Sequence, residues 1–86
     1  MKILDLTPDE LFNVYNDFIL DPDTDSIRDN AKAIAENESG EEGVDYLYND
    51  FMLWLQKREN FTDDEVSIFI TVHGDYIYGN IITLLI

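Results

Sequence analysis

Carboxylates are the only side chains abundant enough to suggest a chemistry for this sequence. The 86 residues contain 19 aspartates and glutamates against five lysines and arginines, so the formal net charge is −14 at pH 7. Paired carboxylates can catalyse glycoside hydrolysis. Among 19 acids such a pair can always be chosen, so we assign no catalytic pair. We therefore treat the acids as candidate binding groups.

An Asp-x-Asp-x-Asp pattern, formed by Asp21, Asp23 and Asp25, is typical of the start of a calcium-binding loop. A complete EF-hand loop needs a glycine at its sixth position, an aliphatic residue at its eighth and a glutamate at its twelfth. This sequence has a serine and an arginine at the first two of those positions, and Lys32 at the last. A cation thus replaces the bidentate carboxylate. We therefore expect these aspartates to cap helices and form turns.

Other catalytic and cofactor motifs are absent from the sequence. There is no cysteine, which excludes disulfides and thiolate zinc sites. His73 is the only histidine, and nothing places Ser67 beside it as a nucleophile. Gly40 and Gly43 are too sparse for a phosphate loop, and no dinucleotide or Walker pattern occurs. We therefore expect a non-enzymatic protein that uses no metal and no cofactor.

The negative charge is concentrated in the first 50 residues. They hold 14 acids and three bases, a balance of −11, whereas residues 51–86 hold five acids and two bases, a balance of −3. Several acids recur four residues apart, and such neighbours on a helix lie ~5–6 Å from one another. Consecutive phosphates of one DNA strand have a broadly comparable spacing. Solubility needs a net charge of magnitude only ~2–8, and the net charge of −14 exceeds this. We therefore expect the acids to form a surface that resembles the backbone of a DNA duplex. The alternative is a surface that serves solubility alone.

Ten acids are the candidate partner-binding residues. Five surround the junction of the first two expected helices, where Arg28 alone offsets them, and we expect this junction to lie within the contact surface. Five more lie at and beyond the end of the second expected helix. The two sets are Asp17, Asp21, Asp23, Asp25 and Asp29, and Glu36, Glu38, Glu41, Glu42 and Asp45. Tyr46 and Tyr48 add aromatic anchors if they are exposed, although we expect Tyr48 to pack in the core.

A single domain over residues 1–86 is expected to position these acids. The first helix begins with a capping box, in which Thr7 is the N-cap and Glu10 the third helical residue, and its apolar stripe runs to about Leu20. The other elements expected in this part are a helix over residues 24–37, a polar loop over 36–43 and a central helix over 44–59.

The C-terminal residues alternate with a period of two, which predicts strands. Residues 66–72 alternate apolar side chains, and Gly74 with Asp75 fits a two-residue hairpin turn. His73 would then lie half-exposed beside the turn. The predicted fold is α+β, with three helices followed by a C-terminal antiparallel β-hairpin and with residues 1–4 as a candidate third strand. The outer face of the hairpin would carry Phe69, Tyr76, Tyr78 and Ile82.

The sequence also favours a cytoplasmic location. No basic region followed by a long apolar segment, as in a secretory signal, is apparent at the N-terminus. The longest uncharged run, residues 76–86, has 11 residues, which is too short for a membrane-spanning helix. Anionic lipid would repel so acidic a chain. The lack of cysteine fits a reducing compartment.

The chain resembles the small acidic inhibitors made by phages and other mobile elements, which include anti-CRISPR proteins, anti-restriction DNA mimics and uracil-DNA glycosylase inhibitors. The resemblance rests on the length, the −14 balance, the lack of catalytic motifs and a row of aspartates. It implies a stoichiometric inhibitor that occupies the nucleic-acid groove of a defence or repair enzyme in the cytoplasm of a bacterial host. The partner would be a basic nucleic-acid-binding protein, such as a nuclease or its complex. The row is Asp9, Asp17, Asp21, Asp25 and Asp29.

Two alternatives stay open at this point. An immunity protein for a nuclease toxin is similar in size and acidity and also binds a basic enzyme surface. A small structural or assembly subunit would instead associate through the aromatic hairpin face. None of these hypotheses involves direct binding of nucleic acid or of a membrane, and each allows a monomer or a homodimer.

Overall fold

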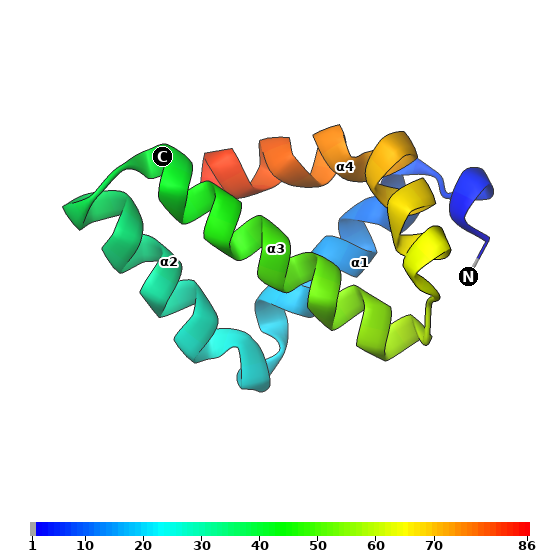
Figure 1. Ribbon diagram of the computed structural model, residues 1–86, viewed down its shortest axis with the longest axis horizontal. Coiled ribbons are helices and arrows are strands. Elements are labelled where there is room, and N and C mark those ends of the chain that lie inside the picture. Colours follow the sequence, from blue (N-terminus) through cyan, green and yellow to red (C-terminus); the bar gives the residue numbers. More distant parts are fainter. Residues whose placement is uncertain (1) are drawn as a thin grey trace.

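The computed structural model describes residues 2–86, which form four α-helices and two short 3₁₀ turns (Figure 1). No strand occurs in these residues. The predicted α+β fold with a C-terminal hairpin is therefore wrong, and the fold is all-α. The elements are η1 (Ile3–Asp5), α1 (Pro8–Leu20), η2 (Pro22–Thr24), α2 (Asp25–Asn37), α3 (Gly40–Glu59) and α4 (Asp63–Leu85).

Local capping groups start α1 and α3, whereas the side chain of Thr24, the N-cap residue of α2, makes no capping hydrogen bond to that helix. The capping box of α1 is confirmed, because the Thr7 hydroxyl accepts the Glu10 N–H at 3.2 Å and the Glu10 carboxylate accepts the Thr7 N–H at 3.1 Å. In α3 the Ser39 hydroxyl accepts the N–H of Glu42 at 3.1 Å, so this helix begins before the expected residue 44 and shortens the expected polar loop. Asn60, at φ 56°, ends α3 in the left-handed conformation.

A second capping box starts α4 in the segment where a strand was expected. The Thr62 hydroxyl accepts the N–H of Glu65 at 3.2 Å, and the Glu65 carboxylate accepts the N–H of Thr62 at 3.1 Å. This is the same arrangement that starts α1, and its threonine-to-glutamate spacing is visible in the sequence. The period-two pattern that follows this capping box lies within a helix and does not indicate a strand.

The burial pattern of α4 explains why the helix is favoured over a hairpin. Phe69, Ile77 and Ile81 recur at multiples of four residues and are fully buried, whereas the alternating residues Ile68 and Val72 are exposed. A lone two-stranded hairpin leaves backbone groups unpaired along both edges and is marginally stable. The helix satisfies those groups internally and still buries a row of large side chains.

The aromatic face predicted for the hairpin does not exist. Phe69 is fully buried, Tyr76 and Tyr78 are half-buried against the core, and Ile82 is exposed. His73 is buried rather than half-exposed. Association through a hairpin face is thereby excluded.

The N-terminal segment forms the turn η1 instead of a strand. His73 fastens this turn to α4, because its Nε2–H donates to the carbonyl oxygen of Ile3 at 2.5 Å. Met1, the first residue of the expected strand, lies outside the described residues. The only histidine of the chain thus has a structural hydrogen bond.

Helix α3 lies at the centre, with α2 and α4 on either side and α1 behind it in Figure 1. The ring of Phe51 on α3 is 5.2 Å from that of Phe18 on α1, in an edge-to-face arrangement, and 6.3 Å from that of Phe69 on α4. All three side chains are fully buried. Three of the four helices therefore meet at one aromatic cluster.

Small residues let α2 and α3 approach closely. A Cβ atom at Gly43 would lie 2.7 Å from the carbonyl oxygen of Ala31 and 2.8 Å from the Cβ of Ala35. Such distances are closer than van der Waals contact, so a larger residue at this position would push the helices apart. The glycine therefore sets the spacing of α2 and α3.

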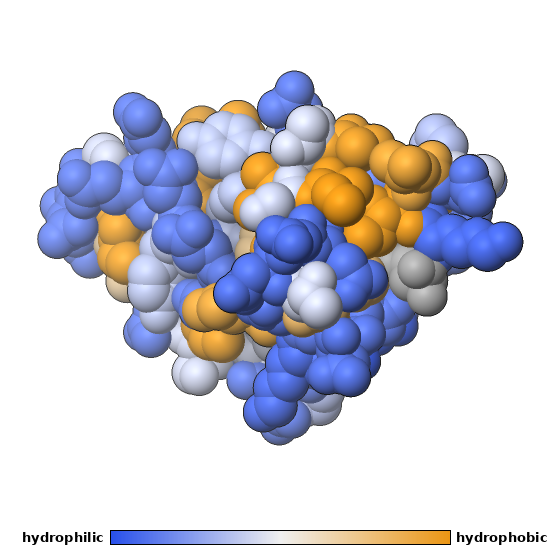
Figure 2. Space-filling model, turned by 45° about the vertical axis from the view of Figure 1, so that its right-hand side comes forward, coloured by the Kyte–Doolittle hydropathy of each residue, from blue (hydrophilic) through white to orange (hydrophobic). Residues whose placement is uncertain are grey.

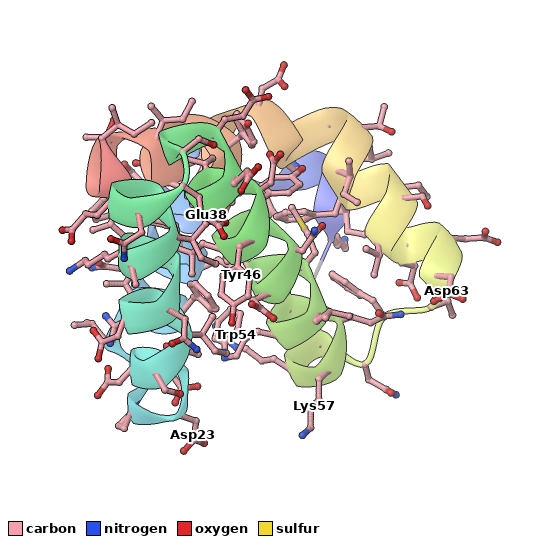
Figure 3. All side chains as sticks on the ribbon, turned by 60° about the vertical axis from the view of Figure 1, so that its left-hand side comes forward. Asp23, Glu38, Tyr46, Trp54, Lys57 and Asp63 are labelled. Atoms are coloured by element: carbon pink, nitrogen blue, oxygen red, sulfur yellow. The ribbon has the colours of Figure 1, made fainter. Side chains whose placement is uncertain are left out.

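Helix α4 is bent. Figures 1 and 3 show that its first half, coloured yellow, and its second half, coloured orange, run in different directions. Gly74 is buried in this helix, and a Cβ atom there would lie 2.6 Å from the hydroxyl of Tyr48. The helix ends at Leu85, and the C-cap residue Ile86 lies against Gly40 at the start of α3.

One helix among residues 2–86 is long and apolar enough to cross a membrane by length and composition. It is α4, in which an 18-residue window has a mean hydropathy of 1.2 and is 28% buried. The uncharged run of residues 76–86 is only the second half of this helix, so its length of 11 residues does not by itself exclude a membrane span. Core helices of proteins in water pass the same test.

Two glycine substitutions test this packing. We expect Gly43→Ala to lower the free energy of unfolding by ~1–3 kcal/mol, because the added methyl group overpacks the contact with α2. Gly79 is the matched control, since no atom lies within 4 Å of a Cβ built there. Gly79→Ala should raise the free energy of unfolding by ~0.5–1 kcal/mol, because alanine favours a helix over glycine. Urea denaturation monitored by circular dichroism measures both free energies. If Gly79→Ala lowered the free energy of unfolding, residue 79 would not be an exposed position within a helix.

Candidate functional site

The ten candidate acids lie in two groups at opposite ends of α2. Figure 3 labels one member of each, Asp23 at one end and Glu38 at the other. A helix of 13 residues is ~20 Å long, so the groups form separate surfaces. We call them the junction group, which is Asp17, Asp21, Asp23, Asp25 and Asp29, and the α2–α3 group, which is Glu36, Glu38, Glu41, Glu42 and Asp45.

The Asp-x-Asp-x-Asp pattern of the junction group forms a turn, as expected. A carboxylate oxygen of Asp21 accepts the N–H of Asp23 at 2.9 Å and thereby caps η2. The hydroxyl of Thr24 donates to the carbonyl oxygen of Phe18 at 2.6 Å, which closes the turn between α1 and α2. The described residues contain no group of three or more metal-ligating side chains placed to hold an ion.

Cations neutralise part of the junction group. Asp17 forms an ion pair with Arg58 at 2.9 Å, and Asp25 forms one with Arg28. The sequence placed only Arg28 near these acids, but the fold also brings Arg58 and Lys57 to them from the last turn of α3. The junction is therefore a surface of mixed charge.

A groove of about 730 Å³ lies at the junction, beside Trp54. The indole N–H of Trp54 donates to Asp21 at 2.9 Å, and the guanidinium carbon of Arg58 lies 5.1 Å from the centre of the indole ring. The hydrogen bond from Trp54, followed by that from the backbone of Asp23, lowers the pKa of Asp21. Sequence reasoning missed Trp54 here, because it is 33 residues from Asp21 and no local pattern links them.

The α2–α3 group has a different electrostatic environment. Its five side chains are exposed, and neither ion pair found among residues 2–86 involves them. A hydrogen bond with Glu38 raises the pKa of Glu42, and repulsion from Glu38, Glu41 and Asp45 adds to the shift. The carboxyl group of Glu42 is thus held close enough to its acidic neighbours to resist ionisation.

Two tyrosines border the α2–α3 group. The hydroxyl of Tyr78 donates to Asp45 at 3.0 Å, and this hydrogen bond is the main cause that raises the pKa of Tyr78. The ring of Tyr48 lies 5.4 Å from that of Tyr78 in an edge-to-face contact. Tyr48 is half-buried against the core, and Tyr46, labelled in Figure 3, is half-buried as well. Partly exposed aromatic rings therefore adjoin the carboxylates.

No family model matches the chain, and neither a curated protein nor a solved structure gives a significant match.

The hydrogen bond between Asp21 and Trp54 can be tested with one substitution. We expect Asp21→Ala to lower the midpoint of urea unfolding, because it removes the cap of η2 and leaves the indole N–H without its acceptor. Trp54 is the only tryptophan, so its fluorescence should also shift to longer wavelength. Asp23→Ala is the control, since its side chain is exposed and its substitution should leave both readings unchanged.

The raised pKa of Glu42 predicts how stability varies with pH. A carboxyl group whose pKa is higher in the folded than in the unfolded state binds more protons when folded, so its charge destabilises the fold at neutral pH. The free energy of unfolding should therefore rise as the pH falls from neutral toward the ordinary value of 4.5. Below that range the effect of Asp21 has the opposite sign. Because the pKa of Asp21 is lowered in the folded protein, its ionised carboxylate stabilises the fold, and this stabilisation is lost as the pH falls further.

Glu42→Gln separates the two effects. The variant lacks the repulsive charge, so its stability should vary less with pH between neutrality and the ordinary glutamate range, while its loss of stability in strong acid should resemble that of the parent. Thermal unfolding across a pH series measures this. An unchanged slope in the upper range would show that Glu42 carries no net repulsion.

Proposed function

We propose that the chain is a non-enzymatic inhibitor of the anti-CRISPR or anti-restriction type, which mimics DNA and blocks the nucleic-acid groove of a bacterial defence or repair enzyme. The observation that supports this most is the α2–α3 group, where exposed carboxylates lie together and form no ion pair with a cation of residues 2–86. The pKa of Glu42 is raised, first by the hydrogen bond with Glu38 and then by repulsion from its acidic neighbours, so its charge is a cost to stability that helix folding does not require. A partner that supplies arginine and lysine side chains would relieve that cost.

The proposed mechanism is electrostatic competition. Carboxylates of the α2–α3 group pair with the basic side chains that otherwise hold phosphates, and the net charge of −14 accelerates encounter with a basic groove. The ring of Tyr78, held beside Asp45, provides apolar contact area at the edge of the charged surface. The inhibitor acts in the cytoplasm of a bacterial host and does not bind nucleic acid itself.

The same surface suits an immunity protein for a nuclease toxin, which is the second candidate function. Both functions place the α2–α3 group against a basic enzyme and differ in the identity of that enzyme. Capture of the partner from infected or toxin-producing bacteria, with identification of the retained protein, distinguishes them.

Two matched variants test the location of the contact. One neutralises four acids of the α2–α3 group, and the other neutralises four acids of the junction group, leaving Asp21 intact because it binds Trp54. We expect the first variant to weaken binding to the captured partner by about tenfold or more and to flatten its salt dependence, and the second to have a smaller effect. The first carries Glu36→Gln, Glu38→Gln, Glu41→Gln and Glu42→Gln, and the second carries Asp17→Asn, Asp23→Asn, Asp25→Asn and Asp29→Asn.

Binding is measured at two salt concentrations, with circular dichroism to establish that both variants fold. Equal affinity of the parent and both variants would show that the acids serve only solubility. A larger effect of the second variant would place the contact at the junction instead.

A further inference from the structure

Hydrophobic side chains are exposed on the first half of α4. Figure 2 shows them gathered over this half of the helix and the adjoining N-terminal turn, with hydrophilic residues around them. Ile68 and Val72 are 44% and 46% exposed, and with Ser67 and Thr71 they line a shallow hollow of about 220 Å³. A hydrophobic hollow with a polar border is typical of a protein-binding surface.

Acidic residues bracket this hollow along the helix. Asp64 lies four residues before Ile68 and Asp75 lies three residues after Val72, so all four side chains share one face of a helix. All four are exposed. No lysine or arginine occurs anywhere in α4. The face therefore presents two apolar side chains with a carboxylate at each end.

We propose that this face of α4 binds an amphipathic helix of another protein, whose apolar side chains enter the hollow and whose lysines or arginines pair with Asp64 and Asp75. The matching pattern is two apolar residues four positions apart, with a basic residue about one turn beyond each. The charges at both ends of the hollow favour this occupant, because a cation compensates a carboxylate on burial.

A second copy of the chain does not meet this requirement. Its α4 offers no cation, so packing two such faces together would bury Asp64 and Asp75 without partners. Each copy also carries a net charge of −14, which opposes association. A lipid surface is also disfavoured, because carboxylates flank Ile68 and Val72 and anionic lipid would repel them.

The binding surface on α4 is independent of the proposed inhibitor function. That function depends on acids of α2 and α3, whereas this surface depends on two apolar residues of α4. Failure of either proposal leaves the other in place.

A synthetic peptide of about 18 residues tests the proposal, since isolated helices shorter than ~12–15 residues are marginal in water. It carries two leucines four positions apart and a lysine about one turn beyond each, on an alanine-rich helix. A second peptide has the same composition in scrambled order, so that it has equal charge but no apolar face. We expect the first peptide to bind the full chain about tenfold more tightly than the second, with NMR shift changes concentrated at residues 64–75.

Variants of the chain complete the test. Ile68→Ser and the isosteric Val72→Thr should each weaken binding of the first peptide by about tenfold, and Asp64→Asn with Asp75→Asn should flatten its salt dependence. Ile82→Ser is the matched control, because Ile82 is 39% exposed on the second half of the same helix, and it should bind like the parent. Circular dichroism of each variant verifies the fold.

Several results would overturn the proposal. Equal affinity for the two peptides, or shift changes confined to the α2–α3 group, would show attraction by charge alone. Concentration-dependent dimers that Ile68→Ser abolishes would assign the face to a second copy. Binding to phosphatidylcholine vesicles that Ile68→Ser abolishes would assign it to a membrane.

Discussion

The contacts of Phe51 with Phe18 and Phe69 are the constraint on which the rest of this structure depends. Each ring comes from a different helix, and all three are fully buried. An 86-residue chain can bury only one modest core, and here α3 lies at its centre. The aromatic cluster therefore determines where α1 and α4 pack, and through them which acids become neighbours on the surface.

Close packing of α2 and α3 has an electrostatic consequence. Gly43 lets the two helices approach until a methyl group would no longer fit between them. Where the two helices join, Glu38 lies near Glu41 and Glu42, and the pKa of Glu42 is raised, first by its hydrogen bond with Glu38 and then by repulsion from its acidic neighbours. At the other end of α2 the fold instead supplies Arg58 and Trp54 to the acids. One helix thus connects an uncompensated acidic surface with a compensated one.

The two faces of α4 have different roles in the structure. Its inner face supplies Phe69, Ile77 and Ile81 to the core, and polar groups on its outer face are satisfied locally, as where Thr71 donates to the carbonyl oxygen of Ser67 at 2.9 Å. This local satisfaction lets a helix rich in β-branched residues remain partly in contact with water. Ile68 and Val72 lie on the outer face and are exposed.

Neighbouring residues alone determined a large part of this protein. The capping box of α1, the turn at Asp21 and the apolar periodicity of α2 depend on residues a few positions apart, and the excess of carboxylates is a matter of composition. Residues 66–82 fit both a period of two and a helical period, and the burial of Phe69, Ile77 and Ile81 in the core favours the helix. The division of the ten acids into two groups also needed the tertiary structure, because Arg58 and Trp54 reach the junction from a distant part of the chain. Local hydrogen bonds are encoded by adjacent residues, whereas packing and charge compensation depend on side chains that only the fold brings together.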